Sequence, residues 1–475
     1  MYRDHSPSPT NFRRCVLFIS ICMILVIVTS AVGQKKGGST PCSKPTAAPP
    51  DTSSHTGSGG LDTSFNGIGY TVRNQLRGIK SVHTTPDGGI IAVGEGARTP
   101  DSPTGTDLLV MRFNADGSLD TTFGDVNITT STEKLGYSYI AITAGSEFIN
   151  AGALDSSGRI YASGWSTGMW YVVRMLPDGT LDPSFSGDGI ASVAYSDGGG
   201  KSIVIQPDGK ILVGGGPHFT VTRFLSDGTI DTTFGSGGKV TYVASSKKTG
   251  GSLLWSLALQ RTAAAPLEDR VVIGGWSNDN ANGTAYFSLM RLRSNGAVDT
   301  SFGTGGKANT SFYGLGDQVR SVAIDPSNRI VAAGIARINS CTLTDFGIAR
   351  FTENGQLDTT FGTGGKAALD LYNDENSVYA LTVQPDGKPI IGGNARVLPT
   401  DPVNRRYYFT LVRFDTAGNL DPTFGPGTAG PGVVTTLLTD YSQSSFIFSL
   451  HQQSDGKILA GGTSTEKPAL ARYLP

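Results

Sequence analysis

Arginine and aspartate side chains recur as pairs, eight positions apart, along most of this sequence. A guanidinium group and a carboxylate form a charge-assisted hydrogen bond, so such pairs either bind a charged ligand or fix the backbone. Because a ligand site rarely needs the same pair in every repeat, we interpret them as structural and expect Asp182→Ala to destabilise the fold. The pairs are Arg112 with Asp120, Arg174 with Asp182, Arg223 with Asp231, Arg291 with Asp299, Arg350 with Asp358, Arg413 with Asp421 and, across the two ends of the repeated region, Arg472 with Asp62.

Acidic turns are a second recurring feature, with Asp-Gly at Asp87-Gly88, Asp208-Gly209, Asp386-Gly387 and Asp455-Gly456. These turns lack the alternating aspartates of a calcium-binding loop. Asp-Gly between two apolar segments is typical of a β-hairpin instead. We therefore predict hairpins at these positions, and we expect no metal, no cofactor and no catalytic residue.

Candidate ligand-binding residues lie in the stretches that differ most between repeats. Trp165, Trp170 and Trp276 could stack on a sugar or an apolar ligand; the alternative is that they cap the hydrophobic ends of the repeats. Polar candidates accompany them, with a solvated loop as the alternative. These are His218, Asp279, Asp401, Arg405 and Arg406.

The elements that position these residues follow from an internal repeat of the type Leu-Asp-x-x-Phe. Around each copy lie an alternating apolar strand, a tight turn, a second strand ending in Gly, a variable loop and a third strand ending in Arg. The residues after the motif, such as 238–242 and 432–436, are expected to form an outer strand. Four short strands per unit are the content of a propeller blade. The sequence thus predicts an all-β fold, a seven-bladed β-propeller of four-stranded blades. The copies begin at Leu61, Leu119, Leu181, Ile230, Val298, Leu357 and Leu420.

These repeats resemble the delta-60 repeat family, a DUF5122-type β-propeller repeat. The resemblance extends from about residue 59 to residue 475, and it implies the propeller fold without implying any catalytic residue.

Two details of the blades can be predicted as well. Pro183 and Pro422 follow the motif Asp, which favours Asp as an N-cap and one short helical turn in each copy. The sequence ends in a third strand, whereas an extra turn and strand open the repeated region at Leu61. We expect this N-terminal strand to complete the last blade and close the propeller. The recurring Phe123, Phe234, Phe302, Phe361 and Phe424 are expected to pack between blades.

The N-terminal region has the pattern of an export signal. Arg13 and Arg14 precede an apolar run over residues 15–28, followed by small residues. We predict a signal peptide or an N-terminal membrane anchor at 1–33, a Gly/Ser/Thr/Pro-rich linker at 34–60 and the seven-repeat propeller at 61–475. The expected location is extracytoplasmic, secreted or anchored to the membrane.

The charge is balanced, with 38 basic and 39 acidic side chains, which argues against a nucleic-acid partner. Because connections alternate between the two ends of a blade, the variable loops gather on one face. We hypothesise a monomeric binding scaffold that uses this face for an unknown protein or carbohydrate ligand. The alternatives are a propeller enzyme of the glycoside hydrolase, lyase or quinone-dependent dehydrogenase class, and a structural surface protein.

Overall fold

The computed structural model describes residues 57–74, 77–97, 105–126, 134–195, 198–243, 251–262, 268–278, 284–337, 344–371, 375–397, 406–425, 430–438 and 444–475. The chain divides into two compact units, residues 1–42 and 43–475, and the described residues belong to the second unit. The expected signal peptide or anchor and most of the expected linker lie outside the described residues. Within the described ranges, no helix has the length and apolar character needed to cross a membrane.

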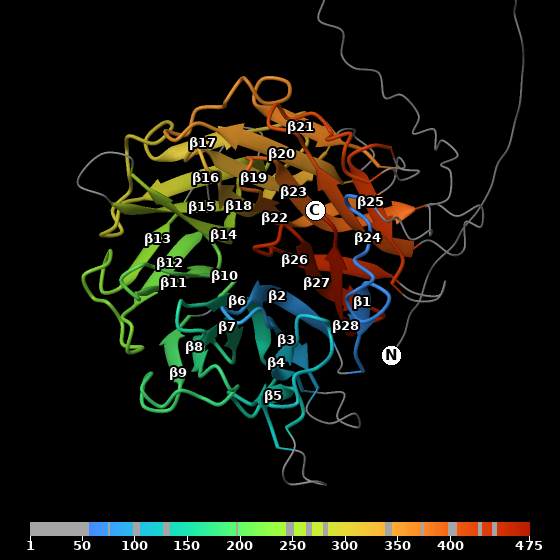
Figure 1. Cartoon of the computed structure of the whole chain (residues 1–475). Helices are drawn as coiled ribbons and strands as arrows, with labels where there is room; N and C mark the ends of the chain where they lie inside the picture. Colours follow the sequence, from blue (N-terminus) through green and yellow to red (C-terminus); the bar gives the residue numbers. More distant parts are fainter. Residues whose placement is uncertain are drawn as a thin grey trace, which may run out of the picture. The chain divides into compact units, whose positions relative to one another are not determined.

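Seven four-stranded antiparallel sheets make up the described part of the chain. Neighbouring sheets contact each other through their inner strands, and the last sheet contacts the first. Figure 1 shows these inner strands arranged around a common centre. The structure confirms the predicted all-β, seven-bladed propeller of four-stranded blades.

Each blade has four strand positions, from the centre outward. The inner strands are β2 (Gly78–Thr84), β6 (Phe148–Leu154), β10 (Ser202–Ile205), β14 (Ser252–Arg261), β18 (Gln318–Ile324), β22 (Asn376–Val383) and β26 (Ser445–Gln452). The second strands are β3 (Ile90–Gly96), β7 (Ile160–Ser166), β11 (Ile211–Gly215), β15 (Asp269–Ser277), β19 (Ile330–Ala336), β23 (Pro389–Val397) and β27 (Ile458–Ser464). The third strands are β4 (Asp107–Phe113), β8 (Met169–Met175), β12 (Phe219–Phe224), β16 (Tyr286–Leu292), β20 (Asp345–Phe351), β24 (Arg406–Arg413) and β28 (Lys467–Tyr473).

The outer strands are short, with three to five residues each. They are β5 (Tyr137–Ile140), β9 (Ile190–Ala194), β13 (Lys239–Tyr242), β17 (Lys307–Thr310), β21 (Lys366–Leu369), β25 (Val433–Thr436) and β1 (Tyr70–Val72). The seventh sheet has the order β1-β28-β27-β26, in which Tyr70 pairs with Ala471 and Val72 with Ala469. A strand from the start of the repeated region therefore occupies the outer position of the seventh blade.

The hydrophobic core lies between adjacent blades. Both faces of the second and third strands are covered by neighbouring blades, so these strands are buried along almost their whole length. This burial explains why the second and third strands are continuous apolar runs in the sequence. The half-buried inner strands alternate between apolar and polar residues instead.

The Leu-Asp-x-x-Phe motif forms a hydrogen-bonded turn that ends each blade. The backbone N–H of Phe123 donates to the carbonyl oxygen of Asp120 (3.0 Å), and the Asp120 side chain accepts the N–H of Thr122 (2.9 Å). The predicted single turn with a capping Asp is present, but it does not extend into a helix, because the residue after Phe has a positive φ, such as 89° at Gly124.

The motif phenylalanines pack between blades, as predicted. Each is at most 1% exposed. Phe123 lies against Gly179 of the following blade, where an added Cβ atom would come within 2.7 Å of the ring. Glycine in this turn therefore permits the close approach of two blades. The same burial holds for Phe234, Phe302, Phe361 and Phe424.

Candidate functional site

The seven recurring Arg and Asp residues form ion pairs in the structure. Nε of each Arg lies 2.7–2.9 Å from Oδ2 of its Asp, and most of these side chains are nearly inaccessible to solvent. The pairs are Arg112–Asp120, Arg174–Asp182, Arg223–Asp231, Arg291–Asp299, Arg350–Asp358, Arg413–Asp421 and Arg472–Asp62.

Most of these arginines also bind the neighbouring blade, a role that the sequence did not reveal. Nη1 of Arg174 donates to the carbonyl oxygen of Ser226 (2.5 Å), and Nη1 of Arg350 donates to that of Thr416 (2.6 Å). In six pairs the guanidinium also lies 4.5–4.8 Å from the centre of the motif Phe ring. These pairs therefore connect adjacent blades, and their burial leaves no room for a ligand.

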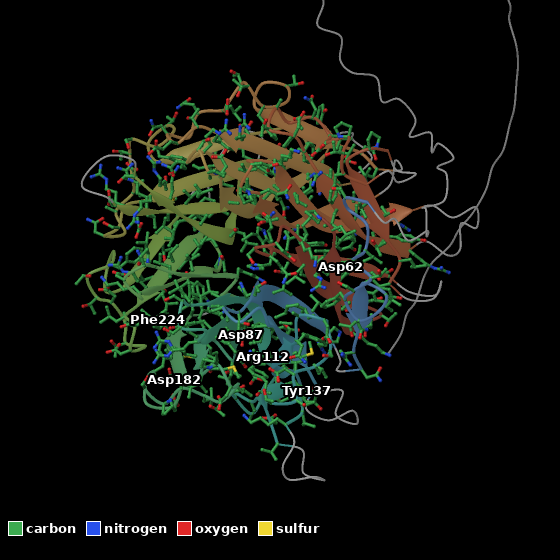
Figure 2. The ribbon with its side chains drawn as sticks, viewed as in Figure 1. Asp62, Asp87, Arg112, Tyr137, Asp182 and Phe224 are labelled. Atoms are coloured by element: carbon green, nitrogen blue, oxygen red, sulfur yellow. The ribbon has the colours of Figure 1, made fainter. Side chains whose placement is uncertain are left out.

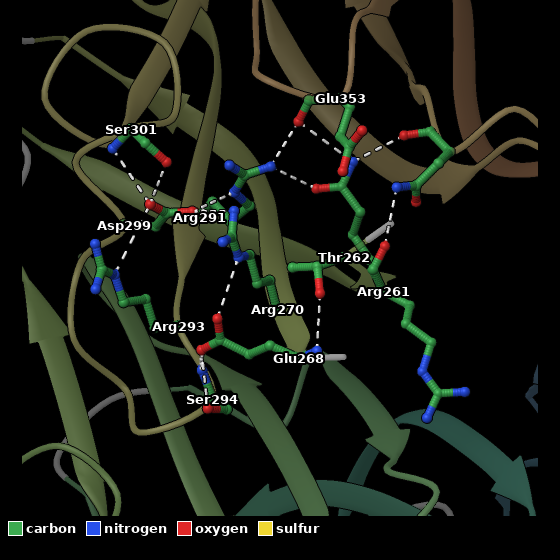
Figure 3. Close-up of polar contacts among 12 residues, drawn as sticks. Arg261, Thr262, Glu268, Arg270, Arg291, Arg293, Ser294, Asp299, Ser301 and Glu353 are labelled. Carbon is green, nitrogen blue, oxygen red and sulfur yellow. Dashed lines mark hydrogen bonds and ion pairs between the residues drawn. The ribbon is translucent and has the colours of Figure 1, made fainter. Parts of the chain in front are cut away.

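The pair in the fourth blade is the most completely enclosed. Arg291 and Asp299 are each 0% exposed, and Nη1 of Arg291 also donates to Oε1 of Gln260 (2.7 Å). Nη1 of Arg270 lies 3.0 Å from Oδ2 of Asp299 and Nε of Arg293 lies 3.9 Å from Oδ1, so three arginines surround this carboxylate (Figure 3). Burial by itself would raise the pKa of Asp299, but hydrogen bonds from Ser301 and the charges of Arg291 and Arg270 hold it below the usual value.

The first blade has the most open pair. The Arg112 side chain is 17% exposed and forms a second ion pair with Asp87 of the nearby hairpin (Figure 2). This second acid distinguishes Arg112 from Arg291, whose only acidic partner within the described residues is Asp299.

The predicted tryptophan sites do not meet in one place. Trp170 is 1% exposed, because its ring packs on Tyr195 with 4.5 Å between ring centres and covers Gly199. The prediction that Trp170 is an exposed ligand contact is therefore wrong. Trp165 is half-buried and stacks on Phe148 at 4.6 Å, and Trp276 is half-buried beside Gly251.

The polar candidates are also separated. His218 has a positive φ of 73°, and its backbone N–H donates to the carbonyl oxygen of Ser252 (2.8 Å). Arg406 begins β24 and is half-buried. Asp279, Asp401 and Arg405 lie outside the described residues. None of the described candidates lines the central cavity, so their roles in binding stay predictions.

The centre of the propeller contains a cavity of about 500 Å³ that all seven inner strands line. One larger side chain from each inner strand enters it near the end where the variable loops join. We call these residues the channel-mouth ring: Lys80, Asn150, Lys201, Trp255, Arg320, Tyr379 and Phe448.

A β-bulge places six of these seven side chains. In six inner strands the pairing with the second strand skips the ring residue, for example Lys80 between Ile79 and Ser81. In the seventh, β10 begins at Ser202, directly after Lys201. A bulge redirects the extra side chain out of the regular alternation, here into the cavity.

Glycine in the second strand permits the bulge. A Cβ atom at Gly94 would lie 2.1 Å from the carbonyl oxygen of Gly78, and one at Gly334 would lie 2.0 Å from that of Gln318. The Gly that recurs at this position in the repeat is thus needed for the shape of the channel mouth.

The channel-mouth ring combines positive charge with aromatic faces. The Arg320 guanidinium lies 4.0 Å from the centre of the Trp255 ring, and Nζ of Lys201 lies 5.0 Å from it. Nζ of Lys80 lies 4.8 Å from the centre of the Phe448 ring, which in turn contacts Tyr379 edge-on at 5.4 Å. Each cation is therefore held beside an aromatic face.

One buried carboxylate offsets part of this charge: Glu95 lies with Lys80 in the lining of the adjacent cavity, and its charge acts on Lys80 and Lys201. No acidic residue belongs to the lining of the central cavity itself, and none lies within ion-pair distance of Lys80, Lys201 or Arg320 in the described part of the chain. Burial lowers the pKa of Lys201, and the charges of Lys80 and Arg320 lower it further. Burial also lowers the pKa of Arg320.

Deeper in the channel the lining is structural. Ser202 accepts the N–H of Leu257 from the next blade (3.0 Å), and Ser256 accepts that of Val322 (3.1 Å). His83 and His451 form an edge-on pair with ring centres 5.9 Å apart. Burial and the proximity of His451 lower the pKa of His83 to about 4, so His83 is neutral near neutral pH. The positive charge is thus concentrated at the mouth.

The geometry defines the class of protein: a closed seven-bladed β-propeller with a cationic and aromatic channel mouth. The repeats match the family model described as "Domain of unknown function (DUF5122) beta-propeller" at residues 85–123, 156–185, 206–234, 269–302, 326–361, 384–424 and 453–475. The chain belongs to this DUF5122 β-propeller family. No curated protein matches the sequence.

Several solved structures are similar in fold. A protein of unknown function from Bacteroides caccae is 10% identical, with a TM-score of 0.34, over 66% of this chain and 81% of that one. A structure of YCF48 bound to D1 peptide is 9% identical, with a TM-score of 0.43, over 86% and 94%. A glucose dehydrogenase is 13% identical, with a TM-score of 0.36, over 85% and 98%. At these values the similarity carries no argument about function.

Proposed function

We propose that this chain is a binding module displayed outside the cytoplasm, and that its ligand site is the channel-mouth ring. The observation that carries the proposal is the ring itself: six bulges and the residue before β10 bring three cations, three aromatic rings and one amide to the mouth of a single cavity. A volume of about 500 Å³ is within the usual range of small-ligand sites. The ligand is a carbohydrate or a segment of another protein.

The blade construction supports binding at this position. The inter-blade Arg–Asp pairs and motif phenylalanines are repeated in nearly every blade, whereas the ring residues differ from one blade to the next. The repeated residues thus stabilise the fold, and the varied ring residues are free to provide the specificity of a binding site.

The aromatic surface continues outward from the ring along the seventh blade to Tyr407 on β24 of the sixth blade. The rings of Phe448 and Phe446 stack with centres 6.3 Å apart, and Tyr407 lies 5.1 Å from Phe446. A second cavity of about 480 Å³ also shares Lys80 and Phe448 with the mouth. A ligand longer than one ring could therefore extend over this surface.

A binding screen tests the proposal. The wild-type protein and the variant Trp255→Leu/Tyr379→Leu would be applied to a glycan array and used in pull-downs from culture fluid. Arg261→Gln is the matched control, because Arg261 lies at the far end of the same inner strand as Trp255 and is exposed. Ligands retained by the wild type and the control but lost by the double variant are the expected result. Ligands that all three proteins retain equally would contradict the proposed site.

The proposed location rests on the N-terminal sequence, where Arg13 and Arg14 precede the apolar run and a Gly/Ser/Thr/Pro-rich stretch follows. Fractionation of the producing cell should find the protein in the envelope or the medium. Recovery in the cytoplasmic fraction alone would contradict the proposed location.

A further inference from the structure

The channel-mouth ring carries three positive charges, and Glu95, which lies in the adjacent cavity and acts on Lys80 and Lys201, offsets only one of them. Lys80, Lys201 and Arg320 come from three different blades and enter the same cavity. Like charges gathered in one partly buried place repel each other, and burial removes part of their hydration. A bound anion would relieve both costs, whereas a neutral ligand would relieve neither.

The aromatic rings restrict the ligand further. Two cations contact the Trp255 ring, and the Trp255 Nε1–H is buried without a hydrogen-bond acceptor. Nε of Arg320 is likewise buried without an acceptor. Unused donors beside an aromatic face are suited to a flat group that bears oxygen atoms at its edge.

We propose that the ligand of the channel-mouth ring is an organic anion that carries a flat ring, with its negative group between Lys201 and Arg320 and its ring against Trp255. This inference rests on the proposed function and specifies the chemical class that the site accepts. Aromatic acids have this chemistry, and acidic sugars supply the same negative group with an apolar C–H face in place of the flat ring.

A matched pair of dyes distinguishes the contribution of the ligand's negative charge to binding from that of its aromatic ring. Anilinonaphthalene sulfonate and N-phenyl-naphthylamine have the same aromatic framework, and only the first carries a sulfonate. The wild-type protein should bind the sulfonate dye at least about tenfold more tightly, as expected for a hydrogen bond to a charged group. Added salt should weaken binding of the sulfonate dye and leave the neutral dye almost unaffected.

Variants locate the effect. Arg320→Gln should reduce the affinity for the sulfonate dye about tenfold and leave that for the neutral dye unchanged. Arg320→Lys keeps the charge and should retain most of the affinity, which excludes a loss through misfolding. Trp255→Leu should weaken both dyes, and Arg261→Gln should change neither. Glucuronate and glucose, compared in the same way, distinguish acidic sugars from aromatic acids as the source of the ligand.

The outcomes separate the two proposals. If Trp255→Leu weakens both dyes but the sulfonate gives no advantage, the site stands and the anionic class is wrong. If both dyes bind equally well to the wild type and Trp255→Leu, the channel-mouth ring is not the binding site, and both proposals fail. A sulfonate preference that persists unchanged in Arg320→Gln and Lys201→Gln would also overturn the inference.

Discussion

Replacing Asp299 by alanine should destabilise the propeller more than any equivalent change in the first blade. Asp299 is 0% exposed and is the carboxylate that faces Arg291 at 2.7 Å and Arg270 at 3.0 Å. Its removal leaves the buried Arg291 without a counter-charge, and such losses cost about 3–5 kcal/mol. It also removes the acceptor of the Ser301 N–H and hydroxyl, which hold the motif turn.

The first blade provides the comparison. Arg112 keeps Asp87 as a second acid when Asp120 is removed, and its side chain is 17% exposed. Asp120→Ala removes the acceptor of the Thr122 N–H in the same way but leaves Arg112 paired, so it should cost about 1–2 kcal/mol, mostly from the lost cap. Urea unfolding followed by tryptophan fluorescence and circular dichroism measures both losses in the free energy of unfolding.

A double variant tests the cause. Arg291→Met/Asp299→Ala removes both charges, so it should be more stable than Asp299→Ala alone. Asp299→Asn keeps an acceptor for Ser301 and should lie between wild type and Asp299→Ala. Equal losses for Asp299→Ala and Asp120→Ala, or no recovery in the double variant, would refute the reasoning.

Three further predictions follow from burial, titration and sheet pairing. Trp170→Ala should cost about 3–5 kcal/mol because its ring fills the core, and Trp276→Ala should cost less; equal melting temperatures would contradict this difference. Hydrogen bonds from Thr423 and Lys388 and the charge of Arg413, acting against burial, lower the pKa of Asp421 from 3.8 to about 2. The stabilisation from ionised Asp421 is therefore complete above about pH 4 and disappears as the pH falls to about 2, so unfolding of Asp421→Asn should depend less on pH in that range. Deleting residues 1–73 removes β1 and exposes the edge of β28, so we expect aggregation or oligomers by light scattering, whereas deletion of residues 1–56 should leave a monomer.

The fold could be predicted because its determinants repeat. The Leu-Asp-x-x-Phe turn recurs in all seven units, and in six of them an Arg precedes the Asp by eight residues although the unit length varies, so each blade supports the interpretation of the others. The predicted outer strand at 238–242 is observed as β13 (Lys239–Tyr242), and the one at 432–436 as β25 (Val433–Thr436).

The candidate site could not be found by the same reasoning, because its residues do not repeat. Lys80, Trp255 and Arg320 occupy equivalent positions but have different chemistry, and the bulge that aligns them interrupts the alternation of the strand. The sequence did contain one signal for these positions: the residue that follows each ring residue is Ser or Ala in every blade, as in Lys80-Ser81, Trp255-Ser256 and Arg320-Ser321. Trp170 was a candidate because tryptophan rings bind ligands, but its ring is buried against Tyr195 and Gly199. No local sequence pattern indicates these contacts.

Crystals of the protein grown with triiodoisophthalate, a flat aromatic dicarboxylate whose iodine atoms scatter anomalously, test the central claim most directly. We predict iodine peaks in the central cavity beside Trp255, with a carboxylate within hydrogen-bonding distance of Lys201 or Arg320. Iodine peaks confined to other surfaces, with the channel mouth empty at saturating ligand, would contradict the account.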